Sequence, residues 1–146
     1  PVTISGGTAT GRLLGGNLSL LTSLLGTKHD PAYANHILFI EEVGESAYRV
    51  DRMLTQLRSA GKLQDLSGIA LGYFTGCDLT PEQTGYEQSI GLMEVFKDRL
   101  GDLGIPVVYG FPFGHEAHNA TLPIGIEAEL DAENGLIRIL EKSINA

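Results

Sequence analysis

The chain has 146 residues, 42% hydrophobic and 19% charged, which fits one globular domain with an ordinary hydrophobic core. Its formal net charge of −8 argues against nucleic acid or an anionic membrane surface as the main partner, because both bind basic surfaces. Its single cysteine excludes an internal disulfide and a cysteine-based zinc cluster, and no apolar run approaches the ~18–20 residues that cross a bilayer.

Short apolar strands alternate with helices along most of the chain, which is typical of an α/β domain. The chain opens at Pro1 with a strand-like run, and because it lacks an initiator methionine we expect a fragment or a processed product. An early strand should end over residues 12–16, and Asn17 is suited to cap a helix over 18–25. The continuous apolar run at 36–40 predicts a strand covered on both faces.

The second part of the chain continues this alternation and then changes character. Helical spacing of apolar residues predicts an amphipathic helix over 46–60. The segments that follow are a strand over 69–74, a loop at Thr80-Pro81, a helix over 86–100 and a strand over 106–109. Alternating runs over 124–130 and 136–140, joined around Asn134-Gly135, predict an antiparallel β-hairpin. With no internal repeat and no domain boundary, the sequence predicts a single mixed α/β domain with a C-terminal hairpin.

Two acids, Glu41 and Glu42, follow the buried strand directly. Open α/β sheets build their sites at the carboxyl ends of strands, so a carboxylate here could orient a catalytic histidine. The alternative is solvation of the strand end and capping of the next helix, which suits Glu45 best. Spacing does not distinguish Glu41 from Glu42 as the functional acid.

His115 is the second candidate, in the segment 110–119. This segment follows another predicted strand, so His115 also belongs near a carboxyl end. The proline and glycines around it favour a defined turn, which can present an imidazole on a rigid support. A neutral imidazole can take a proton from a hydroxyl nucleophile. The alternative is a loop histidine that hydrogen-bonds to the backbone.

A zinc site is a further alternative for the same segment. His115, Glu116 and His118 superficially resemble a zinc-binding helix. That motif needs its histidines four apart on one helical face, whereas here they stand three apart in a predicted loop. We therefore expect no metal at this segment.

Two other motifs are expected to be structural. Cys77 could serve as a nucleophile, yet nothing near it is basic, and Asp78 should raise the pKa of the thiol. The glycine-rich run 11–17 has neither the Gly-Lys-Ser/Thr ending of a phosphate loop nor the dinucleotide-binding pattern. We expect these glycines to allow close backbone packing.

Three sequence blocks stand in order across nearly the whole chain, at 11–27, 37–54 and 113–125. The first reads Gly-Arg-Leu-Leu-Gly-Gly-Asn-Leu and later Leu-Leu-Gly-Thr. The second reads Ile-Leu-Phe-Ile-Glu-Glu-Val-Gly-Glu and later Tyr-Arg-Val-Asp-Arg-Met-Leu, and the third reads Phe-Gly-His and later Thr-Leu-Pro-Ile-Gly. Together they resemble the C-terminal domain of the serine LD-carboxypeptidases, or muramoyltetrapeptide carboxypeptidases. Glu42, where that family usually has Asp, and Ala47, where Pro is common, depart from the pattern.

The resemblance implies a swivelling β/β/α domain and an active site with a Ser–Glu–His triad. It maps the glutamate to Glu41, the first acid after the apolar strand, and the histidine to His115, which follows the Phe-Gly pair. The family's serine and oxyanion hole lie in an N-terminal domain that we expect to be absent from this chain. The chain alone should then be inactive.

The resemblance also implies a cytoplasmic bacterial enzyme of peptidoglycan recycling, often a homodimer, that works without a metal or organic cofactor. It would remove terminal D-alanine from cell-wall muropeptide tetrapeptides. One alternative is the branch of the family that hydrolyses a peptidyl-nucleotide antibiotic to confer self-immunity. That branch holds a nucleobase with aromatic contacts, and the lack of tryptophan counts against it. The other alternative is a non-catalytic binding or assembly module.

Overall fold

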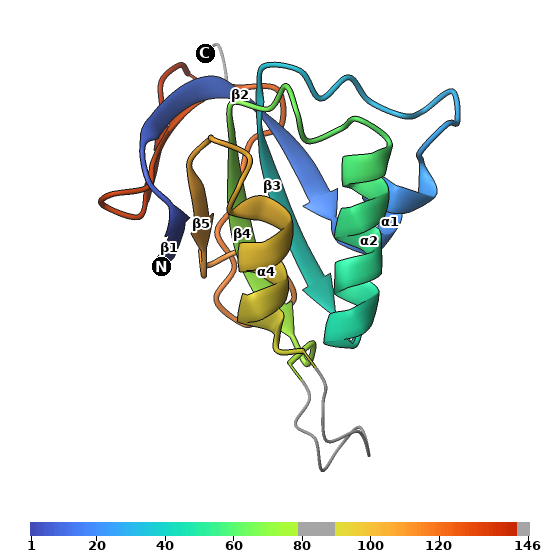
Figure 1. Cartoon of the computed structure of the whole chain (residues 1–146). Helices are drawn as coiled ribbons and strands as arrows, with labels where there is room; N and C mark the ends of the chain where they lie inside the picture. The colour runs from blue at the N-terminus through green and yellow to red at the C-terminus, as the bar shows by residue number, and fades with distance from the viewer. Residues whose placement is uncertain (79–89, 143–146) are drawn as a thin grey trace.

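One curled, seven-stranded mixed sheet organises the part of the chain that the structure describes (Figure 1). A computed structural model describes residues 1–78 and 90–142. The strands are β1 (Val2–Ser5), β2 (Thr8–Asn17), β3 (His36–Val43), β4 (Gly68–Thr75), β5 (Val107–Tyr109), β6 (Glu127–Asp131) and β7 (Leu136–Ile139). The predicted loop at Thr80-Pro81 and the first residues of the predicted 86–100 helix lie outside the described residues.

The strands lie in the order β1-β5-β4-β3-β2-β6-β7. The four central strands, β2 to β5, run parallel to one another, while β1 pairs antiparallel with β5 at one side and the β6–β7 hairpin pairs antiparallel with β2 at the other. Parallel neighbours need crossover connections, which explains the helices between them. Because the central strands are parallel, their carboxyl ends meet at one edge of the sheet, where functional groups commonly gather.

Helices α1 (Leu18–Ser23), α2 (Ala47–Ser59) and α4 (Leu92–Leu100) cover one face of the sheet (Figure 1). Asn17 caps α1 as predicted, since its Oδ1 accepts a hydrogen bond from the Leu20 N–H at 3.2 Å. The helix ends at Ser23, two residues earlier than predicted. The helix predicted over 86–100 corresponds to α4, which begins at Leu92, directly after Gly91.

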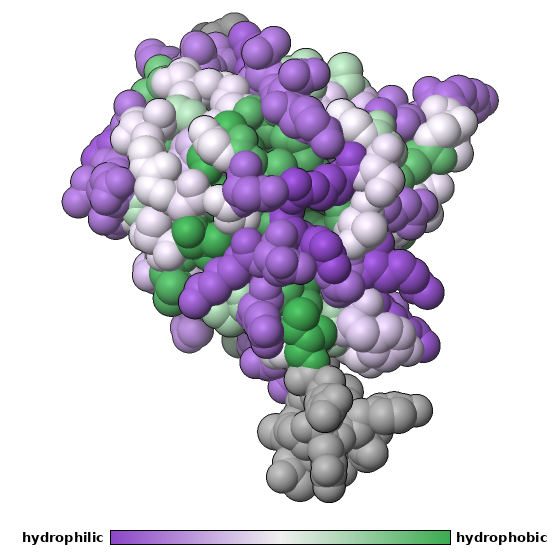
Figure 2. All heavy atoms as spheres, viewed as in Figure 1, coloured by the Kyte–Doolittle hydropathy of each residue, from purple (hydrophilic) through white to green (hydrophobic). Residues whose placement is uncertain are grey.

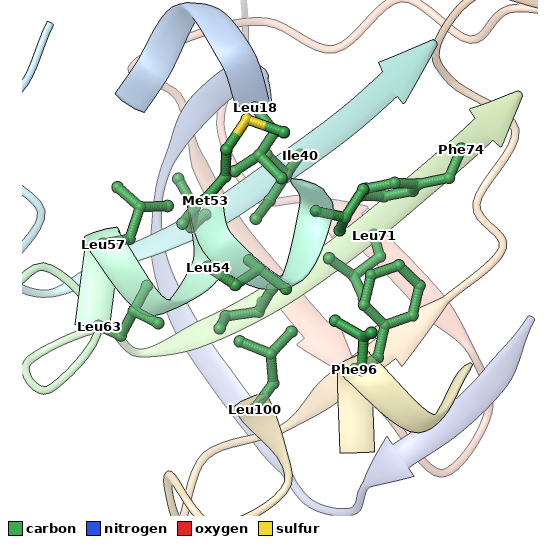
Figure 3. Close-up of a cluster of buried hydrophobic side chains, with 14 of the residues drawn as sticks. Leu18, Ile40, Met53, Leu54, Leu57, Leu63, Leu71, Phe74, Phe96 and Leu100 are labelled. Atoms are coloured by element: carbon green, nitrogen blue, oxygen red, sulfur yellow. The ribbon is translucent and has the colours of Figure 1, made fainter. Parts of the chain in front are cut away.

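Packing rather than capping holds α2 in place. Its N-cap residue, Ser46, makes no side-chain capping bond, whereas Val50, Met53, Leu54 and Leu57 are all buried. A fully buried side chain of this kind contributes roughly 1.5–3 kcal/mol, more than the ~1 kcal/mol of a typical cap. Figure 3 shows Met53, Leu54 and Leu57 among buried side chains of the sheet and of α4. The outward faces of α2 and α4 are mostly hydrophilic (Figure 2), and none of the described helices is long and apolar enough to cross a membrane.

Strand β3 separates two hydrophobic clusters. Successive strand side chains point to opposite faces. Leu38 and Ile40 therefore join the cluster under the helices, while Ile37 and Phe39 join a second cluster on the other face. The second cluster is completed by side chains of β2, β4, β5, β6 and the segment 111–113. A buried strand with both faces covered is confirmed for this run.

The predicted C-terminal hairpin is confirmed. Strands β6 and β7 pair antiparallel around a turn at 132–135, in which Gly135 has φ 61°, a value that glycine adopts without strain. β6 pairs with β2 and so joins the hairpin to the sheet. Residues 124–126, predicted to start the first strand, instead form a loop held by bonds of Gly125 and Ile126 to Leu13.

Candidate active site

The two acids of the central strand lie inside it rather than beyond it. β3 continues to Val43, three residues past the predicted end, because both acids find burial and hydrogen bonds there. Glu41 is 8% exposed and Glu42 is 2% exposed, so solvation of the strand end, the alternative considered from the sequence, is wrong for both. As neighbours on one strand, they point to opposite faces of the sheet.

Glu42 points toward α1 and is fully engaged there. Its carboxylate accepts hydrogen bonds from the Ser19 N–H at 2.8 Å, the Ser19 Oγ–H at 2.7 Å and Asn17 Nδ2 at 2.8 Å. A fourth bond comes from the N–H of Val43 at 2.9 Å. Burial by itself raises the pKa of the Glu42 carboxyl, but these four bonds outweigh it, and the pKa is lowered. Glu42 therefore serves as a second cap of α1, beside Asn17.

Glu41 points to the other face, where it meets His115. Its Oε2 lies 2.7 Å from Nδ1 of the imidazole, across 74 positions of sequence. The carboxylate is buried, whereas the His115 side chain is 55% exposed. Within the described residues, Nε2 of His115 makes no hydrogen bond. A buried carboxylate on Nδ1 fixes the ring and its tautomer and leaves Nε2 available for proton transfer.

A β-bulge in β4 stands directly opposite Glu41. Ile40 of β3 pairs with Leu71 of β4, and Glu42 pairs with Phe74. Two residues of β4, Gly72 and Tyr73, therefore lie opposite the single residue Glu41 of β3. The Tyr73 N–H donates to the Phe113 carbonyl at 2.8 Å, two positions before His115. A Cβ on Gly72 would lie 2.4 Å from Phe113, so this approach requires glycine. The bulge thus holds the histidine segment against the carboxylate.

The segment that carries His115 is an irregular loop, as predicted. Phe113 is buried and packs edge-on against Phe39, with ring centroids 5.7 Å apart. The Gly114 N–H donates to Asn119 Oδ1 at 3.3 Å, and the Ala120 N–H donates to the Pro112 carbonyl at 2.6 Å. These bonds close the turn around the histidine that the proline and glycines of this segment predicted.

The Glu41–His115 pair lies in the wall of an open cavity of about 670 Å³. The cavity is lined by Gly15, Gly16, Phe39, Glu41, Phe113, Gly114, His115, Glu116, Ala117, Asn119, Ala120, Leu122 and Ile124. The glycines of β2 form one side, and a Cβ on Gly15 would lie only 1.8 Å from the Phe39 carbonyl oxygen. The prediction that the glycine-rich run serves close backbone packing is confirmed for Gly15 and for Gly11, where a Cβ would lie 2.8 Å from the Asn35 carbonyl oxygen, but not for Gly16, where a Cβ would meet nothing within 4 Å.

The zinc-like motif does not gather into a cluster. The carboxylate of Glu116 accepts a hydrogen bond from Thr75 Oγ1 at 2.8 Å. His118 lies in the same irregular loop and is exposed. Across residues 1–78 and 90–142, no group of three or more His, Cys, Asp or Glu side chains is placed to hold a metal ion.

Cys77 is fully buried in the cluster under the helices. Burial, and then the charges of Glu42 and Glu45, raise the pKa of its thiol, which disfavours the thiolate. The predicted direction of the shift is therefore confirmed, but its cause differs. Asp78, the expected cause, instead accepts a hydrogen bond from the Leu92 N–H at the start of α4.

Comparison with known proteins identifies the family. The family profile described as the LD-carboxypeptidase C-terminal domain matches residues 10–130. The chain belongs to the LD-carboxypeptidase family. A Synechocystis protein, slr1534, is 51% identical over 134 residues, which cover 92% of this chain and 43% of the relative.

Two solved structures share this fold. The muramoyltetrapeptide carboxypeptidase of Oxalobacter formigenes is 36% identical, with a TM-score of 0.80 over 95% of this chain and 47% of that protein. The microcin C7 self-immunity protein MccF, known from Escherichia coli, is 30% identical, with a TM-score of 0.83 over 99% of this chain and 42% of that protein. The chain thus spans less than half the length of these relatives.

Proposed function

We propose that this domain contributes the glutamate and histidine of a Ser–Glu–His triad in a serine LD-carboxypeptidase. Its substrate would be the terminal D-alanine amide of cell-wall muropeptide tetrapeptides. One observation carries the proposal: a buried carboxylate, Glu41, holds Nδ1 of His115 at 2.7 Å in the wall of a cavity. The serine and the oxyanion hole would come from the part of the family protein that precedes this domain.

The proposed reaction begins when Nε2 of His115 takes the proton of the serine hydroxyl, whose oxygen attacks the amide carbonyl. Glu41 stabilises the imidazolium that forms. The imidazolium then protonates the nitrogen of the departing D-alanine as the C–N bond breaks, which leaves an acyl-enzyme. Water, deprotonated by the same imidazole, hydrolyses this ester and regenerates the serine. The steps use only protein groups and water.

Family resemblance supports four further parts of the proposal. The full-length enzyme would act in the bacterial cytoplasm, in peptidoglycan recycling, and as a homodimer. This chain alone would be inactive, because the resemblance assigns the nucleophile to the family's N-terminal domain. A low but measurable rate of D-alanine release by the isolated chain would contradict that last part.

The test uses the full-length protein and a muropeptide tetrapeptide, with D-alanine release as the readout. Glu41→Ala and His115→Ala should each lower turnover by about 10³-fold or more, because triad members act as a unit. His118→Ala is the matched control, since His118 lies in the same loop without lining the cavity, and it should keep activity. Near-normal turnover by both Glu41→Ala and His115→Ala would reject the triad.

A second candidate is hydrolysis of a peptidyl nucleotide, and the likeness to MccF over 99% of this chain favours it. The two candidates share the proton-handling pair and differ in the leaving group. Two parallel assays would separate the candidates. One measures turnover of the tetrapeptide, and the other measures binding of an aminoacyl sulfamoyl adenosine.

A non-catalytic binding module is the remaining alternative. The presence of a nucleophilic serine upstream in the parent gene would argue against it.

A further inference from the structure

Glu116 is the one anionic side chain of the cavity wall that the proposed reaction does not use. Of the cavity's lining residues, all of them described by the structure, none is a lysine or arginine, while Glu41 and Glu116 are both carboxylates. Glu41 is engaged by His115. Within the described residues Glu116 forms no ion pair. The cavity therefore presents an uncompensated negative charge.

Thr75 holds this charge in place. Its Oγ1 donates to Glu116 Oε1 at 2.8 Å, a contact between the end of β4 and the histidine loop across 41 positions of sequence. A single donor leaves Oε2 and the remaining lone pairs of the carboxylate free to accept further hydrogen bonds. The carboxylate is thus oriented by the protein and still available to a ligand.

The position of Thr75 sets the distance between this charge and the reacting groups. Tyr73 lies in the bulge opposite Glu41, and Thr75 follows it by two residues along β4. Two residues of a strand span roughly 7 Å. The Glu116 carboxylate therefore lies roughly 7 Å from the Glu41–His115 pair. A substrate side chain next to the bond that is cleaved at His115 would reach it.

We propose that Glu116 is a specificity-determining residue that recognises a primary ammonium group on the substrate residue whose carbonyl is attacked. This inference rests on the proposed function, because it assumes that the scissile bond lies at His115. An ammonium offers three donors and a full positive charge, so it pairs with the free oxygen of the carboxylate. A neutral side chain of the same length would leave that oxygen to water.

The test compares two synthetic tetrapeptides that differ only in the residue before D-alanine, which is L-lysine in one and L-norleucine in the other. The full-length protein should show a kcat/KM ratio of roughly 1.5- to fivefold in favour of lysine, the range for a solvent-accessible ion pair. Glu116→Gln should bring the ratio to about one. Glu94→Gln, the same change on the exposed face of α4, should leave the ratio as it was.

An unchanged ratio in Glu116→Gln, even with both rates lowered, would overturn the proposal, and so would equal rates for both peptides in the parent protein. Calorimetry on the His115→Ala variant separates this result from failure of the proposed function. If neither peptide releases D-alanine, the proposed function fails. The dissociation constants of the lysine and norleucine peptides then test the role of Glu116. Tighter binding of the lysine peptide that Glu116→Gln removes supports ammonium recognition by Glu116, and equal constants reject it.

Discussion

Glu41 and Glu42 leave the same strand on opposite faces, and each carboxylate is committed to a different task. Glu41 meets the imidazole of His115, and Glu42 meets the first turn of α1. The two roles are linked through the backbone of β3. The hydrogen bonds from α1 to Glu42 also hold in place the strand end that carries Glu41. The roles of these two neighbouring glutamates can therefore be distinguished by experiment: removing the charge of Glu41 should affect turnover, and removing the charge of Glu42 should affect stability.

Glu42→Gln should destabilise the chain by about 1–3 kcal/mol at neutral pH, because a buried group with charge-assisted hydrogen bonds loses its charge. The pKa of Glu42 is lowered in the folded state. Its contribution is therefore present above the unfolded pKa of about 4.3 and is lost as pH falls through the folded pKa. Urea unfolding at neutral and acidic pH measures both effects. Glu45→Gln, which removes only an exposed i,i+4 pair with Arg49, should cost less than about 0.5 kcal/mol.

Gly114→Ala should separate the Glu41–His115 pair without unfolding the chain. At φ 127° a side chain is strained, at a cost of about 1–3 kcal/mol, and the new Cβ would lie 3.1 Å from Glu41 Cβ and 3.3 Å from Oε2. Proton NMR should show loss of the His115 Nδ1–H signal that the carboxylate protects from exchange. Gly91→Ala is the control, because a Cβ there meets nothing within 4 Å. Retention of the signal in Gly114→Ala would mean that the loop adapts.

Tyr33→Phe should leave the chain as stable or make it up to ~1 kcal/mol more stable. Tyr33 is 4% exposed, and its hydroxyl has no hydrogen-bond partner within the described residues. Burial, and then the charge of Asp30, raise the pKa of Tyr33 to about 12. Below the unfolded pKa of about 10 the phenol is protonated in both states, and as pH rises toward 12 only the unfolded chain ionises it, so the stability of the fold falls. Thermal unfolding between pH 9 and 12 should show a shallower alkaline decline in Tyr33→Phe, whereas a clear loss of stability at neutral pH would mean that the hydroxyl is bonded.

The sequence predicted which segments carry the candidate site but not how they meet. The apolar run before Glu41 and the turn-forming residues around His115 are local signals, and both placed these residues at the correct edge of the sheet. The choice between Glu41 and Glu42 depends on the face each one occupies. That face follows only once β3 is known to continue through both acids, and family resemblance, not spacing, indicated Glu41.

Long-range contacts explain the rest of the difference. The bulge at Gly72 and Tyr73 has no sequence signal of its own, because it arises from how β4 pairs with β3 and with the Phe113 segment. The bond between Thr75 and Glu116 joins two segments that local patterns treat separately. Asn17 was predicted as a helix cap, but its second bond, to Glu42, depends on the parallel pairing of β2 with β3.

The pairing of β1 with β5 and of β2 with β6 has a consequence for biosynthesis. Both pairings join the first residues of the chain to segments about a hundred positions later, so the domain has a high contact order and should fold slowly. During translation β1 and β2 leave the ribosome long before β5 and β6 exist. The Glu41–His115 contact therefore cannot form until the loop that carries the histidine has emerged, and we expect the nascent chain to depend on chaperones until then.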